Sequence, residues 1–405
     1  MTVPGARLSA PLRFPAFRAL AGGRLLLHLG NSVATVALAF AVLDLTGSVA
    51  RLGLVVGARS LATVALLLLG GALSDRLPRP LMLQGSCLAS ASSQAAIAAL
   101  VLLDAATLPL LVTLSMLNGA ATAVGFPAAA AITPQTVPEA VLRPANVLVR
   151  TSSQLGMTIG MSLGGAVSGF VGPGPALAVN AALFALAALC FAAVRVPAPP
   201  SEGERSGILR DLLDGWTEFV ARPWVWIVVL QFMVVNACVS GATVVLGPAI
   251  ADATFGRGGW GLAMACSTAG ALAGGFLAAR WQPRRALFLG VALMLLESLP
   301  MLVLAEAPFI PLLVPVMFLV GVATEQFGVA WEVSLQQNIP AHRLARVYSY
   351  DALGSLVALP VGEIAVGPVA EAVGLERTML GLAVLLCLAT LGALGSRSVR
   401  SLTRR

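Results

Sequence analysis

Three glutamates lie inside long apolar stretches of the chain, where charged side chains are rarely found. Glu325 lies in the stretch 308–330, Glu363 in 346–370 and Glu297 in 285–304. A carboxylate within hydrocarbon is costly unless it faces a cavity or a partner, and there it can take up and release a proton. These residues therefore indicate proton transfer, with a structural hydrogen bond between helices as the alternative for each.

Other polar side chains in similar stretches could contact a small molecule. Arg59 is a candidate counter-charge for one of the glutamates, unless its guanidinium extends outward to the membrane surface. His28 and Asn31 lie one helical turn apart and could face one cavity, although a packing role is the alternative for His28. Four amides are further candidates for the cavity wall: Asn118, Gln154, Gln231 and Asn236.

The sequence offers little for catalytic or metal chemistry. It contains no lysine, so the lysine-containing phosphate-binding loop of ATP-driven pumps is excluded. Its two histidines are not accompanied by clustered cysteines or carboxylates, so we expect no metal site and no cofactor. The five cysteines all lie in apolar stretches and indicate no disulfide framework. We therefore do not expect an enzyme.

The elements that position these residues are membrane-spanning helices. Hydrophobic residues make up 58% of the 405 residues and charged residues only 11%, too few to cover a soluble protein of this size. Most apolar blocks extend to about 20 residues, the length that spans hydrocarbon as a helix. We predict about twelve spans: 20–44, 51–74, 79–103, 107–130, 146–171, 174–195, 224–248, 258–280, 285–304, 308–330, 346–370 and 376–395.

The arginines predict the orientation of these spans. With the N-terminus in the cytoplasm, all but four of the 25 arginines fall on the inner side, as the positive-inside rule requires. Both termini are then cytoplasmic. The net charge of +7 is divided among short segments without interleaved aromatic residues, so we expect no nucleic-acid partner. The richness in alanine and arginine, without lysine, indicates a GC-rich bacterial genome and the plasma (inner) membrane. No removable signal peptide is expected.

The chain divides into two halves around a polar centre. Residues 196–223 begin with a proline-rich linker and continue with leucines and aromatic residues at helical spacing, which predicts an amphipathic helix on the cytoplasmic membrane surface. We therefore predict a six-helix bundle over 1–195, a linker over 196–223 and a second six-helix bundle over 224–405.

The two halves echo each other in sequence. Gly71 and Arg76 recur as Gly275 and Arg280, each at the inner turn between the second and third spans of its half, and three glycines of 156–169 recur in 354–367. Unless this echo arose by chance, it indicates two pseudo-symmetric bundles with a substrate site at their interface.

One inner loop has the composition of a conformational gate. It contains Gly71, Asp75, Arg76 and Arg79, which place a lone carboxylate among cationic groups beside a glycine that permits close helix contact. Such a cluster can hold two helix ends together in one conformation and release them in another. An ordinary positive-inside loop is the alternative.

This loop resembles the signature loop of the major facilitator superfamily, G-x-L-x-D-R-x-G-R-R/K, with Pro78 and Pro80 where the family usually has glycine and a basic residue. The resemblance implies that Asp75 is the gate residue and faces the N-terminus of the eleventh helix. Three patches, at 43–48, 126–146 and 335–355, are similar to the drug-efflux branch that includes macrolide efflux proteins and the enterobactin exporter.

Four glycines in the fifth span look like the antiporter motif of the superfamily's exporters: Gly156, Gly160, Gly164 and Gly165. Met161 stands where the motif has proline, and plain helix packing explains these glycines equally well.

In the superfamily the first, fourth, seventh and tenth helices line the cavity, and the second, fifth, eighth and eleventh flank it. The resemblance therefore makes Glu325 and Glu363 the better candidates for proton coupling, and Glu297 a structural residue. Ser115 and Asn31 replace an arginine and an aspartate that many proton-coupled relatives carry.

We therefore expect a monomeric exporter of a hydrophobic or amphipathic small molecule, such as a drug, antibiotic or siderophore, that works by proton antiport and alternating access in the lipid bilayer. An importer or uniporter on the same fold is the near alternative. A membrane sensor or scaffold that transports nothing is the alternative from another class.

Overall fold

The computed structural model describes residues 9–74, 77–196, 219–281, 283–339 and 341–402, and in this part of the chain all regular secondary structure is helical. Eleven of the described helical segments are long and apolar enough to cross a membrane. Helices are expected here because lipid offers no hydrogen-bond partners, so each backbone group must be paired within its own segment.

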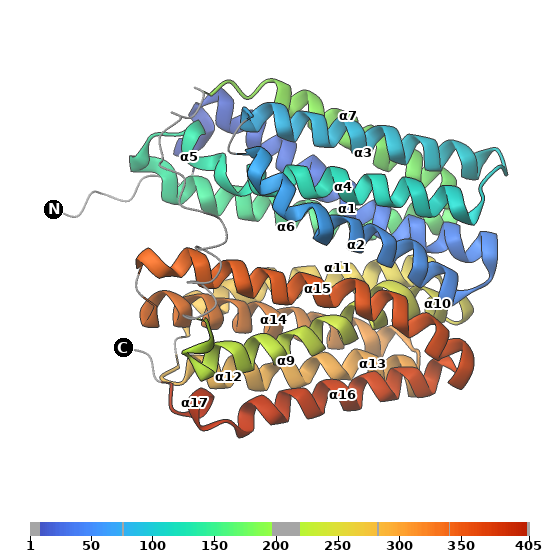
Figure 1. Cartoon of the computed structure of the whole chain (residues 1–405). Helices are drawn as coiled ribbons and strands as arrows, with labels where there is room; N and C mark the ends of the chain where they lie inside the picture. The colour runs from blue at the N-terminus through green and yellow to red at the C-terminus, as the bar shows by residue number, and fades with distance from the viewer. Residues whose placement is uncertain (1–8, 75–76, 197–218, 282, 340, 403–405) are drawn as a thin grey trace. The chain divides into compact units, whose positions relative to one another are not determined.

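The first half of the chain forms six long helices joined by short turns (Figure 1). Gly47 ends the first of them in a left-handed conformation (φ 61°), and its N–H donates to the carbonyl of Leu43. The long helices are α1 (Pro15–Thr46), α2 (Val49–Ser74), α3 (Arg79–Leu102), α4 (Leu108–Ala131), α6 (Leu142–Phe170) and α7 (Pro173–Ala192). Short helical turns lie at η1 (Ala10–Arg13), α5 (Thr133–Thr136) and η2 (Glu139–Val141).

The second half forms six further spans. Two of them are built from several pieces: α9 (Pro223–Ser240), η3 (Gly241–Leu246) and α10 (Gly247–Ala253) make one, and α12 (Ala286–Leu293), η4 (Met294–Glu297) and α13 (Ser298–Glu306) make another. The others are α11 (Arg257–Arg280), α14 (Ile310–Asn338), α15 (Ala341–Val373) and α16 (Leu375–Gly395), followed by the short α17 (Arg397–Arg400).

The predicted fifth span, 146–171, is a helix but is not among the eleven. This helix, α6, contains several Ser, Thr and Gly residues and a glutamine in place of larger apolar residues. Its length of 29 residues is sufficient for a span.

Two spans depart from α-helical geometry just before a proline. The segment η3 is a π-helical turn that precedes Pro248, and η4 is a 3₁₀ turn that precedes Pro300. A proline has no N–H to donate and its ring collides with the carbonyl four residues earlier, so the preceding turn must widen or tighten. The turn η3 follows Ser240, a residue of the candidate site described below, and η4 contains Glu297, one of the three glutamates found in apolar stretches of the sequence.

The chain divides into two compact units. The N-terminal unit comprises Met1–Arg51 and Ala58–Pro200, and the C-terminal unit comprises Leu52–Gly57 and Ser201–Arg405. Most of the predicted linker, including its amphipathic helix up to residue 218, lies outside the described residues. The predicted boundaries at 195 and 223 therefore stay a prediction.

The same pairs of helices pack together within each unit. The first and fifth spans pair as α1 with α6 and as α9 with α15, and the third and sixth pair as α3 with α7 and as α13 with α16. Glycine makes equivalent contacts in both units: a Cβ on Gly119 would lie 2.2 Å from the carbonyl oxygen of Arg59, and one on Gly321 would lie 1.9 Å from that of Ser267. The duplication inferred from sequence is thus present in the packing.

Each unit has its own apolar core. In the N-terminal unit it includes the fully buried Phe17, Leu83 and Phe191, and in the C-terminal unit Val225 and Leu335. Packing in these cores fixes the rotation of each helix about its own axis. It thereby fixes the direction in which the polar side chains of that helix point.

Candidate functional site

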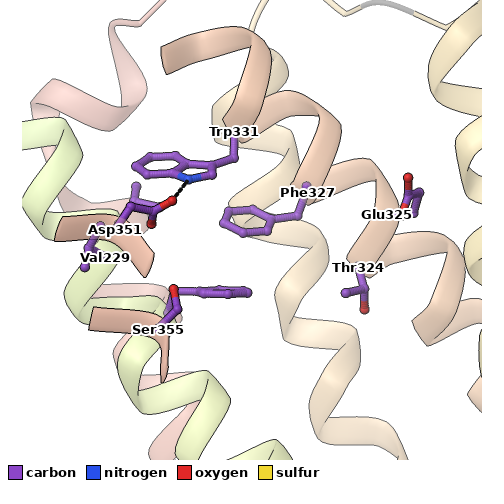
Figure 2. Close-up of a pocket in the computed structure, with 10 residues that line it drawn as sticks. Val229, Thr324, Glu325, Phe327, Trp331, Asp351 and Ser355 are labelled. Atoms are coloured by element: carbon purple, nitrogen blue, oxygen red, sulfur yellow. Dashed lines mark hydrogen bonds between the residues drawn. The ribbon is translucent and has the colours of Figure 1, made fainter. Parts of the chain in front are cut away.

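A cavity of about 250 Å³ opens within the C-terminal unit between α9, α14 and α15 (Figure 2). Aromatic rings and two carboxyl groups dominate its wall. The main side chains are Phe232 from α9, Thr324, Glu325, Phe327 and Trp331 from α14, and Asp351 and Ser355 from α15. Their mixture of apolar surface and negative charge suits a small molecule that is itself amphipathic.

The rings of this wall form a continuous stack. Phe232 stacks on Phe327 with 4.9 Å between ring centroids, and Phe327 stacks on Trp331 at 6.4 Å. Residues 327 and 331 are one turn apart on α14, so their side chains lie one above the other. Trp224 packs edge-on against Trp331 at 5.8 Å. Since Phe327 and Trp331 are buried, the stack presents a rigid aromatic surface.

Asp351 is held against this aromatic surface. The indole Nε1–H of Trp331 donates a hydrogen bond of 3.0 Å to Oδ2 of Asp351, which is half-buried (Figure 2). The sequence analysis missed Asp351, although it lies within the predicted span 346–370. The rule that singled out Glu325, a carboxylate within an apolar stretch, would have found it.

Glu325 lies on α14 beside α11. Its Oε1 lies 3.8 Å from the position that a Cβ on Gly275 would occupy, and its own Cβ lies 3.0 Å from the equivalent position on Gly274. Glycine at 274 therefore allows α14 to approach α11 at Glu325, and the carboxylate lies over Gly275 at ordinary contact distance. In Figure 2, Glu325 points away from the Trp331–Asp351 pair. The carboxyl groups of Glu325 and Asp351 therefore lie at different parts of the cavity wall.

Glu363 is almost completely buried on α15, with 4% of its surface exposed. Ser240 Oγ–H donates a hydrogen bond of 2.6 Å to its Oε1. Ser240 is the last residue of α9 before the π-helical turn η3. The two helices meet closely here, because a Cβ on Gly362 would lie 2.1 Å from the carbonyl oxygen of Ala237. Glycine at 362 is therefore what allows α9 to enclose the carboxylate.

In the N-terminal unit the structure brings together two of the predicted cavity residues. Arg59 Nη2–H donates a hydrogen bond of 2.9 Å to Asn31 Oδ1. His28 lies half-buried one turn before Asn31 on α1, and Gln154 lies half-buried on α6. The hydrogen bond links α1 to α2 and holds a cationic group inside the unit.

The other amides bond to neighbouring helices. Asn118 Nδ2–H donates to Ser93 Oγ at 3.4 Å, and Gln231 Nε2–H donates to Thr390 Oγ1 at 3.3 Å. Asn236 Nδ2–H donates to the backbone carbonyl of Ser355, a cavity residue, at 3.2 Å. Asn118 and Gln231 therefore hold helices together in this structure, and a contact with substrate stays a prediction for all three.

The predicted gate is only partly described. Asp75 and Arg76 lie outside the described residues, and Gly71 lies in the last turn of α2. Arg79 begins α3 and Arg280 ends α11 with an exposed side chain. The gate therefore stays a prediction.

The glycines of the antiporter-like motif face α1. A Cβ on Gly156 would lie 2.5 Å from the carbonyl oxygen of Leu25, one on Gly160 would lie 2.4 Å from that of Leu29, and one on Gly164 would lie 3.0 Å from Val33 Cα. Gly165, the fourth residue of the motif, is also buried. The first three let the backbones of α6 and α1 touch.

Gly160→Ala is expected to destabilise the N-terminal unit. The added methyl group would lie 2.4 Å from the backbone carbonyl oxygen of Leu29 and 2.8 Å from the Cβ of Ser32, and such overpacking costs about 1–3 kcal/mol. A lower melting temperature in detergent would show it. Gly85→Ala on α3 is the matched control, because nothing lies within 4 Å of its added Cβ. Equal melting temperatures for the two variants would contradict this view of the glycine contacts.

The family model described as Major Facilitator Superfamily matches residues 20–362. The chain belongs to this superfamily. It is therefore a multi-pass membrane protein and a secondary transporter, not an enzyme, and its predicted all-α membrane fold is confirmed.

A curated relative is similar in sequence to this chain, and two solved structures are similar in fold. The chain is 28% identical over 389 residues to the multidrug efflux pump Tap of Mycolicibacterium fortuitum, covering 92% of each protein. It is 17% identical, with a TM-score of 0.76, to a bacterial homologue of the human lysosomal transporter Spinster, an inward-facing and unoccupied structure, covering 95% of this chain and 96% of that one. The nucleoside transporter NupG (D323A mutant) has a TM-score of 0.77 and 15% identity over 94% of this chain and all of that one.

Proposed function

We propose that this superfamily member exports hydrophobic or amphipathic small molecules, with lipophilic cations as its preferred substrates, in exchange for protons. The observation that carries the proposal is the cavity in which Asp351 and Glu325 accompany the rings of Phe232, Phe327 and Trp331. A cation is attracted to the face of an aromatic ring and to a carboxylate, and its apolar part gains by leaving water.

The direction of transport rests on kinship. The relative Tap is a multidrug efflux pump, and the alignment with it covers 92% of this chain. Three sequence patches are similar to the drug-efflux branch of the superfamily. The vesicle experiment described below distinguishes an exporter from an importer.

Proton coupling is assigned to Glu325 and Glu363. A buried carboxylate in a membrane is stabilised by whatever neutralises it, and that is either a proton or a cationic substrate. A substrate cation that enters the cavity therefore favours release of a proton from Glu325, and protonation favours release of the substrate. Glu363 lies on the same helix as Asp351, about three turns further along. Glu325 on α14 is thus the first proposed proton site, and Glu363 on α15 is the second.

Alternating access supplies the movement. The gate residues Gly71, Asp75, Arg76, Arg79, Gly275 and Arg280 hold one conformation in the proposed cycle, and the glycines of α6 let it move as one body with α1. The transporter acts as a monomer in the bacterial plasma membrane with both termini in the cytoplasm, as the distribution of arginines supports.

Inverted membrane vesicles test the proposal. Vesicles that contain the transporter should accumulate a fluorescent lipophilic cation such as ethidium when their lumen is acidified, and should lose it when nigericin collapses the pH gradient. A neutral dye of similar size should accumulate less. Accumulation only in right-side-out vesicles would establish an importer, and accumulation that ignores the pH gradient would remove proton coupling.

A further inference from the structure

The span that contains Glu297 is interrupted at that residue. The 3₁₀ turn η4 (Met294–Glu297) separates α12 from α13, and Pro300 follows three residues later. Because Pro300 cannot donate to the carbonyl of Leu296, the regular ladder of hydrogen bonds is broken beside Glu297. A 3₁₀ stretch inside a long helix often marks a functional hinge.

Glu297 is enclosed almost entirely by protein, with 7% of its surface exposed. Among the described residues, its one hydrogen-bond partner is Thr324, whose Oγ1–H donates to its Oε1. The turn η4 packs against α12, α13, α14 and α16. No hydrogen bond or ion pair within the described residues joins Glu297 to the ionisable groups of those helices, which are Glu306, Glu325, Glu332, Glu376, Arg377 and Cys387.

Thr324 connects this buried carboxyl group to the cavity. It is an exposed residue of α14, lines the cavity and directly precedes Glu325. Its hydroxyl oxygen also lies 2.9 Å from the backbone carbonyl oxygen of Val320. A hydroxyl group has one proton to donate and two lone pairs that accept, so Thr324 has two alternative acceptors for a single proton.

This arrangement satisfies both protonation states of Glu297. When the carboxylate is ionised, Thr324 donates to it. When the carboxyl group is protonated, it donates to Thr324 Oγ1, and Thr324 donates to the carbonyl of Val320. Neither state leaves a buried donor without an acceptor, so the change of state avoids the cost of an unpaired polar group.

We infer that Glu297 is a further proton-carrying residue of the transport cycle, and that the Thr324 hydroxyl is the positioning group through which it exchanges protons with the cavity. The inference rests on the proposed proton antiport. In the exchange, the Thr324 hydroxyl turns from the Val320 carbonyl to water in the cavity, and the Glu297 carboxyl proton then passes to Thr324 Oγ1 while the hydroxyl proton of Thr324 passes to that water. The products are a Glu297 carboxylate, an intact threonine hydroxyl and a hydrated proton.

The test uses purified transporter in proteoliposomes that report internal pH. Glu297→Gln is expected to melt near the wild-type temperature and to bind ethidium as the wild type does, but to exchange fewer protons per ethidium and to show a flatter dependence of transport on pH. Thr324→Val should change both readouts in the same direction, and Thr324→Ser should restore them. Glu306→Gln, at the end of α13, is the control that should leave both unchanged.

Wild-type proton stoichiometry and pH profile in Glu297→Gln would overturn the inference. If Glu297→Gln does not fold, the Thr324 pair decides: unchanged stoichiometry in Thr324→Val, or a failure of Thr324→Ser to restore it, also overturns the inference. Absence of proton exchange in the wild type would instead remove the proposed function, so the two failures are distinguishable.

Discussion

Glu363→Gln is expected to abolish accumulation of substrate against its gradient while leaving the protein folded. Glutamine has nearly the same shape and its amide oxygen can still accept the hydrogen bond from Ser240, so the contact between α9 and α15 is retained. It has no proton to release. A gradient of about one pH unit is worth about 1.4 kcal/mol per proton, which drives roughly tenfold accumulation of substrate. We expect Glu363→Gln to lose this accumulation.

The measurement is accumulation of ethidium in inverted vesicles at a fixed pH gradient, compared with passive exchange of ethidium in the absence of a gradient. Passive exchange should persist in Glu363→Gln, because the cavity residues are unchanged. Glu376→Gln, an exposed glutamate in the first turn of α16, is the matched control. Undiminished accumulation in Glu363→Gln would remove Glu363 from the coupling mechanism.

Asp351→Asn is expected to weaken binding of lipophilic cations by about tenfold or more and to leave neutral substrates almost unaffected. Two unit charges about 4 Å apart attract by about 4 kcal/mol at an effective dielectric constant of 20, and only part of this is lost again to desolvation. Asparagine can still accept the hydrogen bond from Trp331, so the aromatic wall should keep its position.

Equilibrium binding of a cationic dye and of a neutral dye of similar size would measure this difference. Trp331→Phe is the informative companion, since it removes the N–H donor but keeps an aromatic ring beside Phe327. Equal losses for the cationic and the neutral dye in Asp351→Asn would mean that Asp351 supports the fold of the cavity and does not select charge.

The turns η3 and η4 show that hydropathy predicts the position of a span but not the helical geometry within it. Both spans were predicted at nearly the observed positions, because their length and apolar character depend only on composition. The π turn at Gly241–Leu246 and the 3₁₀ turn at Met294–Glu297 have their sequence signal in Pro248 and Pro300. A proline indicates that a ladder is broken, but the choice between a wider and a tighter turn depends on the helices packed around it.

The predicted sites show the same division. Glu325 and Glu363 stood out because a carboxylate within an apolar stretch is costly wherever the helix points. Asp351 carries the same sequence signal as Glu363, in the same predicted span, although it was not predicted. Thr324 and Ser240 carry no sequence signal, since hydroxyl groups are common in membrane helices. Glu297 was interpreted as a structural residue on a peripheral helix, and its connection to the cavity became visible only through Thr324.

The sequence by itself determined that the chain spans a membrane many times, because the thickness of hydrocarbon and the cost of charge act on each segment separately. Only the tertiary structure decided which polar groups meet. Ser240 and Glu363 are 123 residues apart, Thr324 and Glu297 are 27 apart, and Trp331 and Asp351 are 20 apart. Each pair depends on the rotation of two helices about their own axes, and that rotation is set by the packing of glycines and rings against neighbouring helices.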